Sequence, residues 1–245
     1  RFPSPYLNGI FDTLNYRAWN SAALETNRGC PYGCTFCDWG SATQSKVNGF
    51  AVDRLKAELE WFGRHKIGYI FCCDANFGIL KRDLEVAEYA AEVRSKTGYP
   101  RALVVQNSKN VTDRALAVHR ILAQAGLDTD VTLSMQSLHP EVLKKVKREN
   151  ISLDYFRDLR QALMRENIKA YTDMILGLPG ETYDSFVEGI CTLIQHGQYH
   201  DIHIFTAGPL SQAGKADPSY RAENGIEFGK TRLVFVASPR QAPFE

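Results

Sequence analysis

The sequence predicts an α/β fold, a partial (β/α)6 barrel of TIM type with parallel strands. Short apolar runs typical of strands alternate with amphipathic helical stretches along most of the chain. These runs are mostly continuous, as in strands that are buried on both faces of a parallel sheet. Successive right-handed crossovers tend to curl such a sheet, and 245 residues are compatible with one barrel domain.

Six strands are expected, and the informative polar residues fall where these strands end. The first strand leads into a cysteine-rich loop. Function in this class of fold sits at the carboxyl edge of the sheet, so the strand ends are the places to search for a site. In chain order, the predicted strands span residues 22–29, 68–76, 101–108, 130–137, 169–178 and 200–208.

Helices are expected between the strands because apolar side chains recur at helical spacing, for example at i, i+4 and i+7 in the first helix. Ser152 and Thr182 are suited to cap two of them, and Gly126 is suited to end a third. The predicted helices span residues 52–67, 80–97, 112–125, 152–167 and 182–196. After residue 208 the chain is rich in Gly, Pro and Ser, and only residues 231–238 look like a short strand.

The composition excludes several classes of partner. With 29 basic and 28 acidic residues, the chain has no charge excess for nucleic acid or an anionic membrane surface. No apolar run approaches the length of a membrane span, and no secretion signal is present, so a cytoplasmic location is expected. The first residue is Arg1, and we expect the chain to be a fragment of a longer protein.

The stretch GCPYGCTFCDWG places Cys30, Cys34 and Cys37 in one loop with C-x3-C-x2-C spacing. Structural zinc sites usually pair C-x2-C elements and close with four ligands. A four-iron cluster also takes four ligands, so three cysteines would leave one iron open to a non-protein ligand. A structural zinc site and a redox thiol loop are the alternatives, and the spacing fits both poorly.

The remaining cysteines and the histidines favour structural roles. Cys72, Cys73 and Cys191 lie in apolar runs and are expected to be small buried hydrophobic residues. His200 and His203 are an odd number of residues apart and should point to opposite faces of a strand. His196 is placed at a helix end, where a cation suits the dipole, so a histidine metal site is not expected.

The cysteine spacing, with aromatic Phe36 before the last cysteine, resembles the signature of the radical S-adenosylmethionine (SAM) enzymes. The resemblance covers nearly the whole chain, because six β/α units follow the loop. It implies that Cys30, Cys34 and Cys37 hold a [4Fe-4S] cluster whose open iron is chelated by SAM. It also implies an electron donor such as flavodoxin or ferredoxin.

The same resemblance implies further cofactor contacts. Arg148 would pair with the SAM carboxylate, for which a guanidinium fork is suited. Asp74 and Asn76 stand where relatives carry a Gly-Gly-Glu-like segment for the SAM amino group. Taken alone, Arg148 could instead belong to a solvated helix face and Asp173 could face solvent. The residues expected to bind cofactor are Phe36, Asp74, Asn76, Gln106, Ser134, Gln136, Arg148, Asp173, Gly177, Phe205 and Thr206.

The segments FPSPYLNGIFD and ADPSYRAENGIE, which flank the core, resemble the cobalamin-binding subgroup of these enzymes. Residues 1–21 would then be a linker from an N-terminal cobalamin domain, 22–210 the core, and 211–245 a C-terminal extension in which residues could be missing. The resemblance implies a cobalamin-dependent methyltransferase of secondary metabolism, with a small-molecule or peptide substrate. Alternatives are a B12-independent enzyme, such as a methylthiotransferase or a coproporphyrinogen oxidase-like protein, and a non-catalytic Fe-S module.

Overall fold

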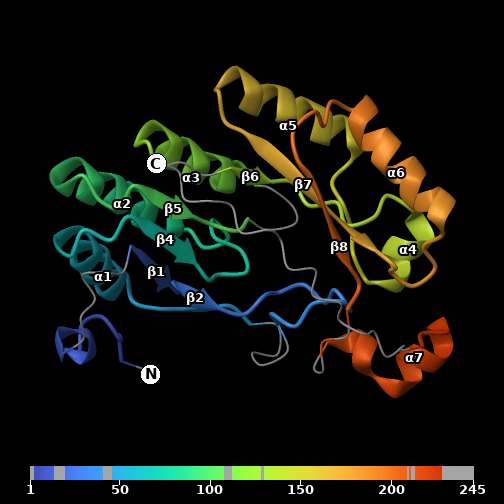
Figure 1. Ribbon diagram of the computed structural model, residues 1–245, viewed down its shortest axis with the longest axis horizontal. Coiled ribbons are helices and arrows are strands. Elements are labelled where there is room, and N and C mark those ends of the chain that lie inside the picture. Colours follow the sequence, from blue (N-terminus) through green and yellow to red (C-terminus); the bar gives the residue numbers. More distant parts are fainter. Residues whose placement is uncertain are drawn as a thin grey trace, which may run out of the picture.

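Six parallel strands follow one another across the molecule in chain order (Figure 1). In this computed structural model they form two three-stranded sheets, ordered β1-β4-β5 and β6-β7-β8, with every pairing parallel. The strands are β1 (Ser21–Leu24), β4 (Tyr69–Cys72), β5 (Ala102–Val104), β6 (Val131–Thr132), β7 (Ala170–Leu176) and β8 (Ile202–Thr206). The structure describes residues 3–13, 20–40, 46–107, 112–127, 130–208, 210 and 213–227.

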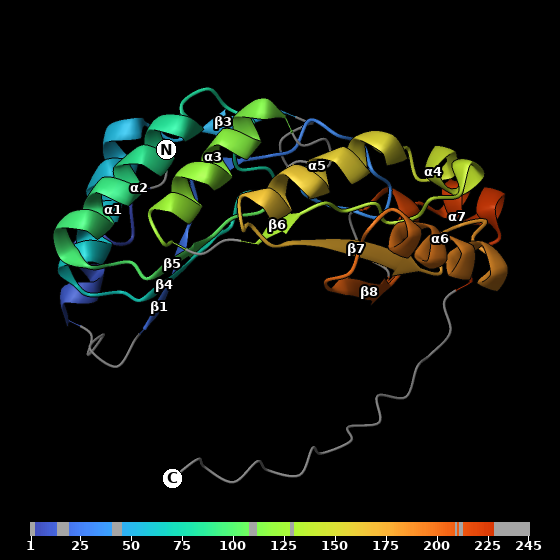
Figure 2. The ribbon, with the colours of Figure 1, turned by 90° about the horizontal axis from the view of Figure 1, so that it is seen from above.

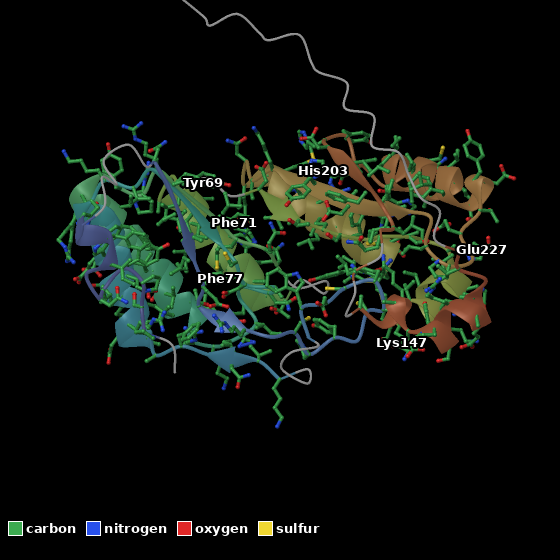
Figure 3. The ribbon with its side chains drawn as sticks, turned by 60° about the horizontal axis from the view of Figure 1, so that its bottom comes forward. Tyr69, Phe71, Phe77, Lys147, His203 and Glu227 are labelled. Atoms are coloured by element: carbon green, nitrogen blue, oxygen red, sulfur yellow. The ribbon has the colours of Figure 1, made fainter. Side chains whose placement is uncertain are left out.

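The helices that connect these strands gather on one side of them, as Figure 2 shows from above. Ile70 and Cys72 of β4 point to this side and are fully buried. Tyr69 and Phe71 point to the other side, and each keeps 40% of its surface exposed (Figure 3). The strands therefore bury one face under helices and leave the inner face open, which confirms a partial barrel. These helices are α1 (Val52–Arg64), α2 (Asp83–Thr97), α3 (Asp113–Gln124), α5 (Leu153–Arg165) and α6 (Tyr183–Gln195).

Residues chosen from local chemistry mark the helix ends correctly. The Ser152 hydroxyl accepts a bond from the Tyr155 amide at 3.2 Å. Thr182 forms a reciprocal capping box with Ser185 at the start of α6. Gly126 follows α3 with a φ of 65°, a conformation that glycine adopts without strain.

The strands are shorter than predicted, mainly at their carboxyl ends. The first strand stops at Leu24, and Asn27–Arg28 (β2) instead pairs antiparallel with Asn48–Gly49 (β3). After β4, for example, the Asp74 side chain accepts hydrogen bonds from Thr26 and Asn27 in the loop before the cysteines. Besides β3, four short elements were not predicted: η1 (Ile10–Thr13), α4 (Pro140–Lys145), η4 (Gly214–Ala216) and α7 (Pro218–Asn224). The predicted strand at 231–238 lies outside the described residues.

The hydrophobic core has two main clusters, one for each half of the barrel. The first lies around Leu55, Phe62 and Ile70, and the second around Phe156 and Met174. Helix α3 contributes residues to both clusters and so joins the halves. None of the helices in the described part of the chain has the length and apolar character needed to cross a bilayer.

The beginning of the predicted linker packs onto the first half of the core. The Tyr6 ring stacks on Phe11 with centroids 5.2 Å apart and meets the edge of Phe62 at 4.6 Å. Its hydroxyl donates to the Ala23 carbonyl of β1 at 2.5 Å. Residues 3–13 are therefore held against α1 and β1. Their role as a connection from a cobalamin domain stays a prediction.

Candidate metal and cofactor site

The three cysteines of the loop line one cavity at the carboxyl edge of the strands. Cys30 is 9% exposed, and Cys34 and Cys37 are partly exposed. The loop turns tightly, because the Cys37 amide donates to the Cys34 carbonyl at 3.2 Å. Burial raises the pKa of the Cys37 thiol, and the other two thiols add to this rise. The cavity measures about 210 Å³ and holds polar groups from both halves of the barrel.

Asp74 shapes the chain just before the cysteine loop and is fully buried. One carboxylate oxygen accepts the backbone amides of Thr26 and Asn27 at 2.7 and 3.1 Å. The other accepts the Thr26 hydroxyl and the Asn27 side-chain amide. Burial raises its pKa, which these hydrogen bonds oppose. Both Asp74 oxygens therefore accept hydrogen bonds from the chain, and Asp74 is not among the residues that line the cavity, while its role toward the SAM amino group stays a prediction.

Asn76 and Gln106 line the cavity, and their binding of a cofactor stays a prediction. The Asn76 amide donates to the Cys30 sulfur at 3.2 Å. The Gln106 backbone carbonyl accepts the Phe77 amide at 2.7 Å, which ties β5 to the loop that carries Asn76. Asn107 also lines the cavity and donates across to the Thr132 carbonyl at 2.8 Å.

Arg148 is 7% exposed and lines the cavity, so it does not belong to a solvated helix face. Its Nη2 donates to the Ser134 carbonyl, and its Nε donates to Asn150 Oδ1 at 2.8 Å. Burial lowers the pKa of the guanidinium, while Cys34 acts in the opposite direction. The side chain is therefore a fixed cation next to the cysteine loop.

Ser134, Gln136 and Asp173 form the wall opposite the first half of the barrel. The Ser134 hydroxyl donates to Asp173 Oδ2 at 2.6 Å, and Asp173 Oδ1 lies 3.5 Å from His203 Nδ1. Gln136 has a φ of 65°, which is uncommon for any residue other than glycine. Its Oε1 is buried and has no hydrogen-bond partner among the described residues. Such a buried acceptor is costly unless a ligand supplies a donor.

The four other predicted residues lie at the open end of the second half. Phe36 lines the main cavity and two adjoining ones, and Thr206 lines one of these with it. Gly177 has a φ of 85° and turns the chain after β7. Phe205 is 54% exposed, with its ring 6.3 Å from that of His203, and lines none of the three cavities.

The donor set fits a multi-iron cluster better than a single ion. Among the described residues, no three His, Cys, Asp or Glu side chains stand close enough together to bind one metal ion. A four-iron cluster is larger than one zinc ion, so its thiolate ligands stand farther apart. Three thiols around one cavity, with a cation and an unpartnered amide oxygen beside them, suit a cluster and a second, polar ligand.

Of the three other cysteines, all expected to be buried, only one is buried. Cys72 is buried, as predicted, whereas Cys73 is partly exposed and Cys191 is exposed. The prediction of burial was wrong for Cys191 because it lies on the outer face of α6, and for Cys73 because it follows Cys72 and points to the open side of β4. His196 caps α6 and contacts the Thr192 carbonyl at 2.8 Å.

Two supporting residues were not found from the sequence. Asn150 donates to the Met135 and Ser137 carbonyls at 2.9 and 2.8 Å while accepting from Arg148. His119 contacts Asn107 Oδ1 through Nε2 at 2.5 Å. Both residues support the site through tertiary contacts. The only signals for them are that Asn150 contacts the buried Arg148 and that His119 contacts Asn107 at a strand end.

Comparison with known proteins agrees with this geometry. A sequence model of the radical SAM superfamily matches residues 24–190. The chain is 45% identical to the cobalamin-dependent radical SAM methyltransferase TokK of Streptomyces tokunonensis over 97% of its length. It is 44% identical, over the same share, to the 2-(S-pantetheinyl)-carbapenam-3-carboxylate methyltransferase of Streptantibioticus cattleyicolor. In each case the chain spans 35% of the relative.

A solved structure shows the same fold. It is that of the radical S-adenosylmethionine methyltransferase TsrM from Kitasatospora setae, with tryptophan and a SAM analogue bound. The TM-score is 0.62 at 17% sequence identity, covering 78% of this chain and 36% of TsrM. At this identity the likeness establishes the fold and nothing finer.

Proposed function

Because the chain belongs to the radical SAM superfamily, we propose that it is the catalytic core of a cobalamin-dependent methyltransferase that acts on a small molecule of secondary metabolism. The observation that carries this proposal is the cavity shared by the three cysteines, Arg148 and the polar wall of the second half barrel. The two relatives of 44–45% identity, both named methyltransferases, support the choice of reaction.

Cys30, Cys34 and Cys37 would hold a [4Fe-4S] cluster, leaving one iron open to SAM. When bound, the cluster supplies an electron that cleaves the sulfonium of SAM, and cobalamin supplies the site that carries the methyl group. Asn76 would help to position Cys30 as a cluster ligand through its 3.2 Å contact with the sulfur. Burial of Cys30 keeps water from that ligand.

Arg148 would bind the SAM carboxylate, because it is the buried cation that lines the cavity beside Cys34. Asn76 lines the cavity and is the better candidate for the SAM amino group, because the Asp74 oxygens already accept hydrogen bonds from the chain. Asp173, oriented by Ser134, and the free Oε1 of Gln136 would receive the ribose hydroxyls. All these contacts come from side chains held by the fold, so SAM would be oriented without large rearrangement.

A second, open cavity of about 580 Å³ adjoins the first at the rim and includes Arg28, Trp39 and Leu210. We propose that the substrate and the cobalamin approach SAM from this side. The corrin would be held mainly by parts of the protein outside this chain, which spans only about a third of its curated relatives. The electron donor would be a flavodoxin or ferredoxin, and the reducing cytoplasm is the compartment that suits an exposed cluster loop.

The proposal is tested on the full-length protein, reconstituted anaerobically with iron, sulfide and cobalamin. About four irons per chain and retained corrin absorbance after gel filtration are expected. SAM should then be consumed with formation of S-adenosylhomocysteine and 5′-deoxyadenosine. Cys34→Ala should lose the iron, whereas Cys191→Ala, the control on the outer face, should keep it.

Two results would contradict the proposal in distinguishable ways. Protein that cleaves SAM but retains no cobalamin would move the assignment to a B12-independent radical SAM enzyme. Tetrahedral zinc bound by the three thiols would remove the cluster altogether. A methylthiotransferase would need a second cysteine set, and Cys72 and Cys191 lie on different elements with opposite exposure.

A further inference from the structure

The segment that follows the barrel closes onto the cysteine loop. The Lys215 amide in η4 donates to the Thr35 carbonyl at 2.8 Å, and Thr35 lies between Cys34 and Phe36. A side chain on Gly214 would come within 3.4 Å of the Thr35 Cβ, so the two backbones are in close contact. The Tyr220 hydroxyl of α7 lies 3.0 Å from the Thr35 hydroxyl. Lys215 is therefore held at a fixed position relative to the loop.

The Lys215 side chain is largely covered by the protein and lines a cavity. The residue is 6% exposed, and its amine makes no hydrogen bond or ion pair with the other described residues. It lines a cavity of about 250 Å³ together with Phe36, Ile175 and Thr206. Burial lowers the pKa of its amine. An amine in such a place is costly unless a ligand accepts its hydrogens, whether the amine is charged or neutral.

We propose that Lys215 is a cofactor-binding residue that donates a hydrogen bond to a ring nitrogen of the SAM adenine. This inference rests on the proposed function, because SAM must be the ligand of the site. The cavity walls favour a flat, uncharged heteroaromatic ring, since Phe36 and Ile175 are apolar and Lys215 supplies the polar contact. Adenine has acceptor nitrogens on its ring edge and needs no counter-charge.

The two cations of the site, Arg148 and Lys215, would bind different ends of SAM. Arg148 lines the neighbouring cavity beside Cys34 and would hold the carboxylate there. Phe36 lines both cavities and so lies between the two cations. A second cation is unfavourable next to the positive sulfonium, whereas the adenine end carries no charge. Lys215 would thus fix the nucleoside end of SAM while Arg148 fixes the amino-acid end.

The test uses the full-length reconstituted protein and measures SAM dissociation constants. Lys215→Met keeps the length and removes the donor, and it should weaken SAM binding by about 10–100-fold. Lys144→Met, an exposed lysine on α4, is the matched control and should bind SAM like the wild type. Iron content should be equal in all three proteins.

A second measurement separates a binding role from a structural one. SAM analogues in which one adenine ring nitrogen is replaced by C–H are titrated against each protein. The wild type should bind one of them about 10-fold more weakly than SAM, and Lys215→Met should bind that analogue and SAM alike. Lys215→Gln keeps a hydrogen-bond donor and should retain part of the discrimination between SAM and that analogue. If Lys215→Met loses iron, Lys215→Gln replaces it in this measurement.

Weak binding by Lys215→Met with undiminished discrimination among the analogues would make Lys215 structural and overturn the inference. Unchanged SAM affinity in Lys215→Met, with the wild type binding SAM, would overturn the inference alone. A wild type that holds the cluster but binds no SAM would overturn the proposed function and the inference with it.

Discussion

Arg148 shows how one buried side chain combines structure with ligand binding. Its guanidinium is fixed by Ser134 and Asn150, and its remaining surface faces the cysteine cavity. Arg148→Ala should weaken SAM binding by roughly 2–4 kcal/mol, since a desolvated carboxylate would lose its partner. Isothermal titration of the cluster-loaded protein measures this, with exposed Arg157→Ala as the control. Unchanged affinity would remove Arg148 from the SAM site.

His119 gives the protein a pH dependence of stability. Burial lowers the pKa of its imidazole from 6.5 to about 4 in the folded state. The unfolded chain therefore takes up a proton first as the pH falls, so the folded state loses stability between pH 6.5 and about 4. The loss should total about 3 kcal/mol from this residue. The unfolding free energies of the wild type and His119→Gln should approach one another by this amount over that range, and parallel curves would contradict the assignment.

Substitution of Asp74 distinguishes a role in stability from a role in SAM binding. Asp74→Asn exchanges an acceptor for a donor that would face the Thr26 hydroxyl and the Asn27 amide. Stability should fall by roughly 2–4 kcal/mol, because buried donors lose their partner. Denaturant unfolding measures this, and exposed Asp184→Asn is the control. If cluster-loaded Asp74→Asn kept its stability but lost affinity for SAM, Asp74 would instead be a ligand for the SAM amino group.

At the level of elements, helix α7 contacts the cysteine loop through the Tyr220 side chain. The Tyr220 hydroxyl meets both the Thr35 hydroxyl and the Lys145 carbonyl, at 3.0 and 2.9 Å. Lys147, just after α4, lies beside this helix (Figure 3). Tyr220→Phe should lower stability by about 1–2 kcal/mol and speed the loss of iron in air. Tyr183→Phe, on a tyrosine that is 80% exposed, should change neither.

The sequence predicted what local chemistry encodes. The six predicted core strands and the five predicted helices exist, the caps Ser152 and Thr182 are in place, and the cysteines meet at one cavity. Strand ends were predicted too long because polar residues such as Asp74 leave the ladder for partners distant in sequence. Lys215 was missed because its burial depends on a segment that returns from beyond the barrel, and no local pattern records that return.

On the scale of the whole molecule, the barrel consists of two halves. No backbone ladder joins β5 to β6 among the described residues, and the two main hydrophobic clusters are separate. The junction instead includes α3 and the Asn107 side chain, which donates to the Thr132 carbonyl. The cysteine cavity lies across this junction, with Cys30 and Asn76 on one side and Ser134 and Asp173 on the other.

A ligand in that cavity would contact both halves of the barrel and hold them together. No backbone ladder joins the halves among the described residues, so contacts of the ligand with both halves would strengthen their junction. Ligand binding and the rigidity of the barrel would therefore be thermodynamically linked. The amide hydrogens of β5 and β6 should then exchange with solvent more slowly when SAM is bound. The barrel would be most rigid when SAM is bound. In each turnover, SAM binding would join the two halves, and loss of the bound ligand would loosen them again.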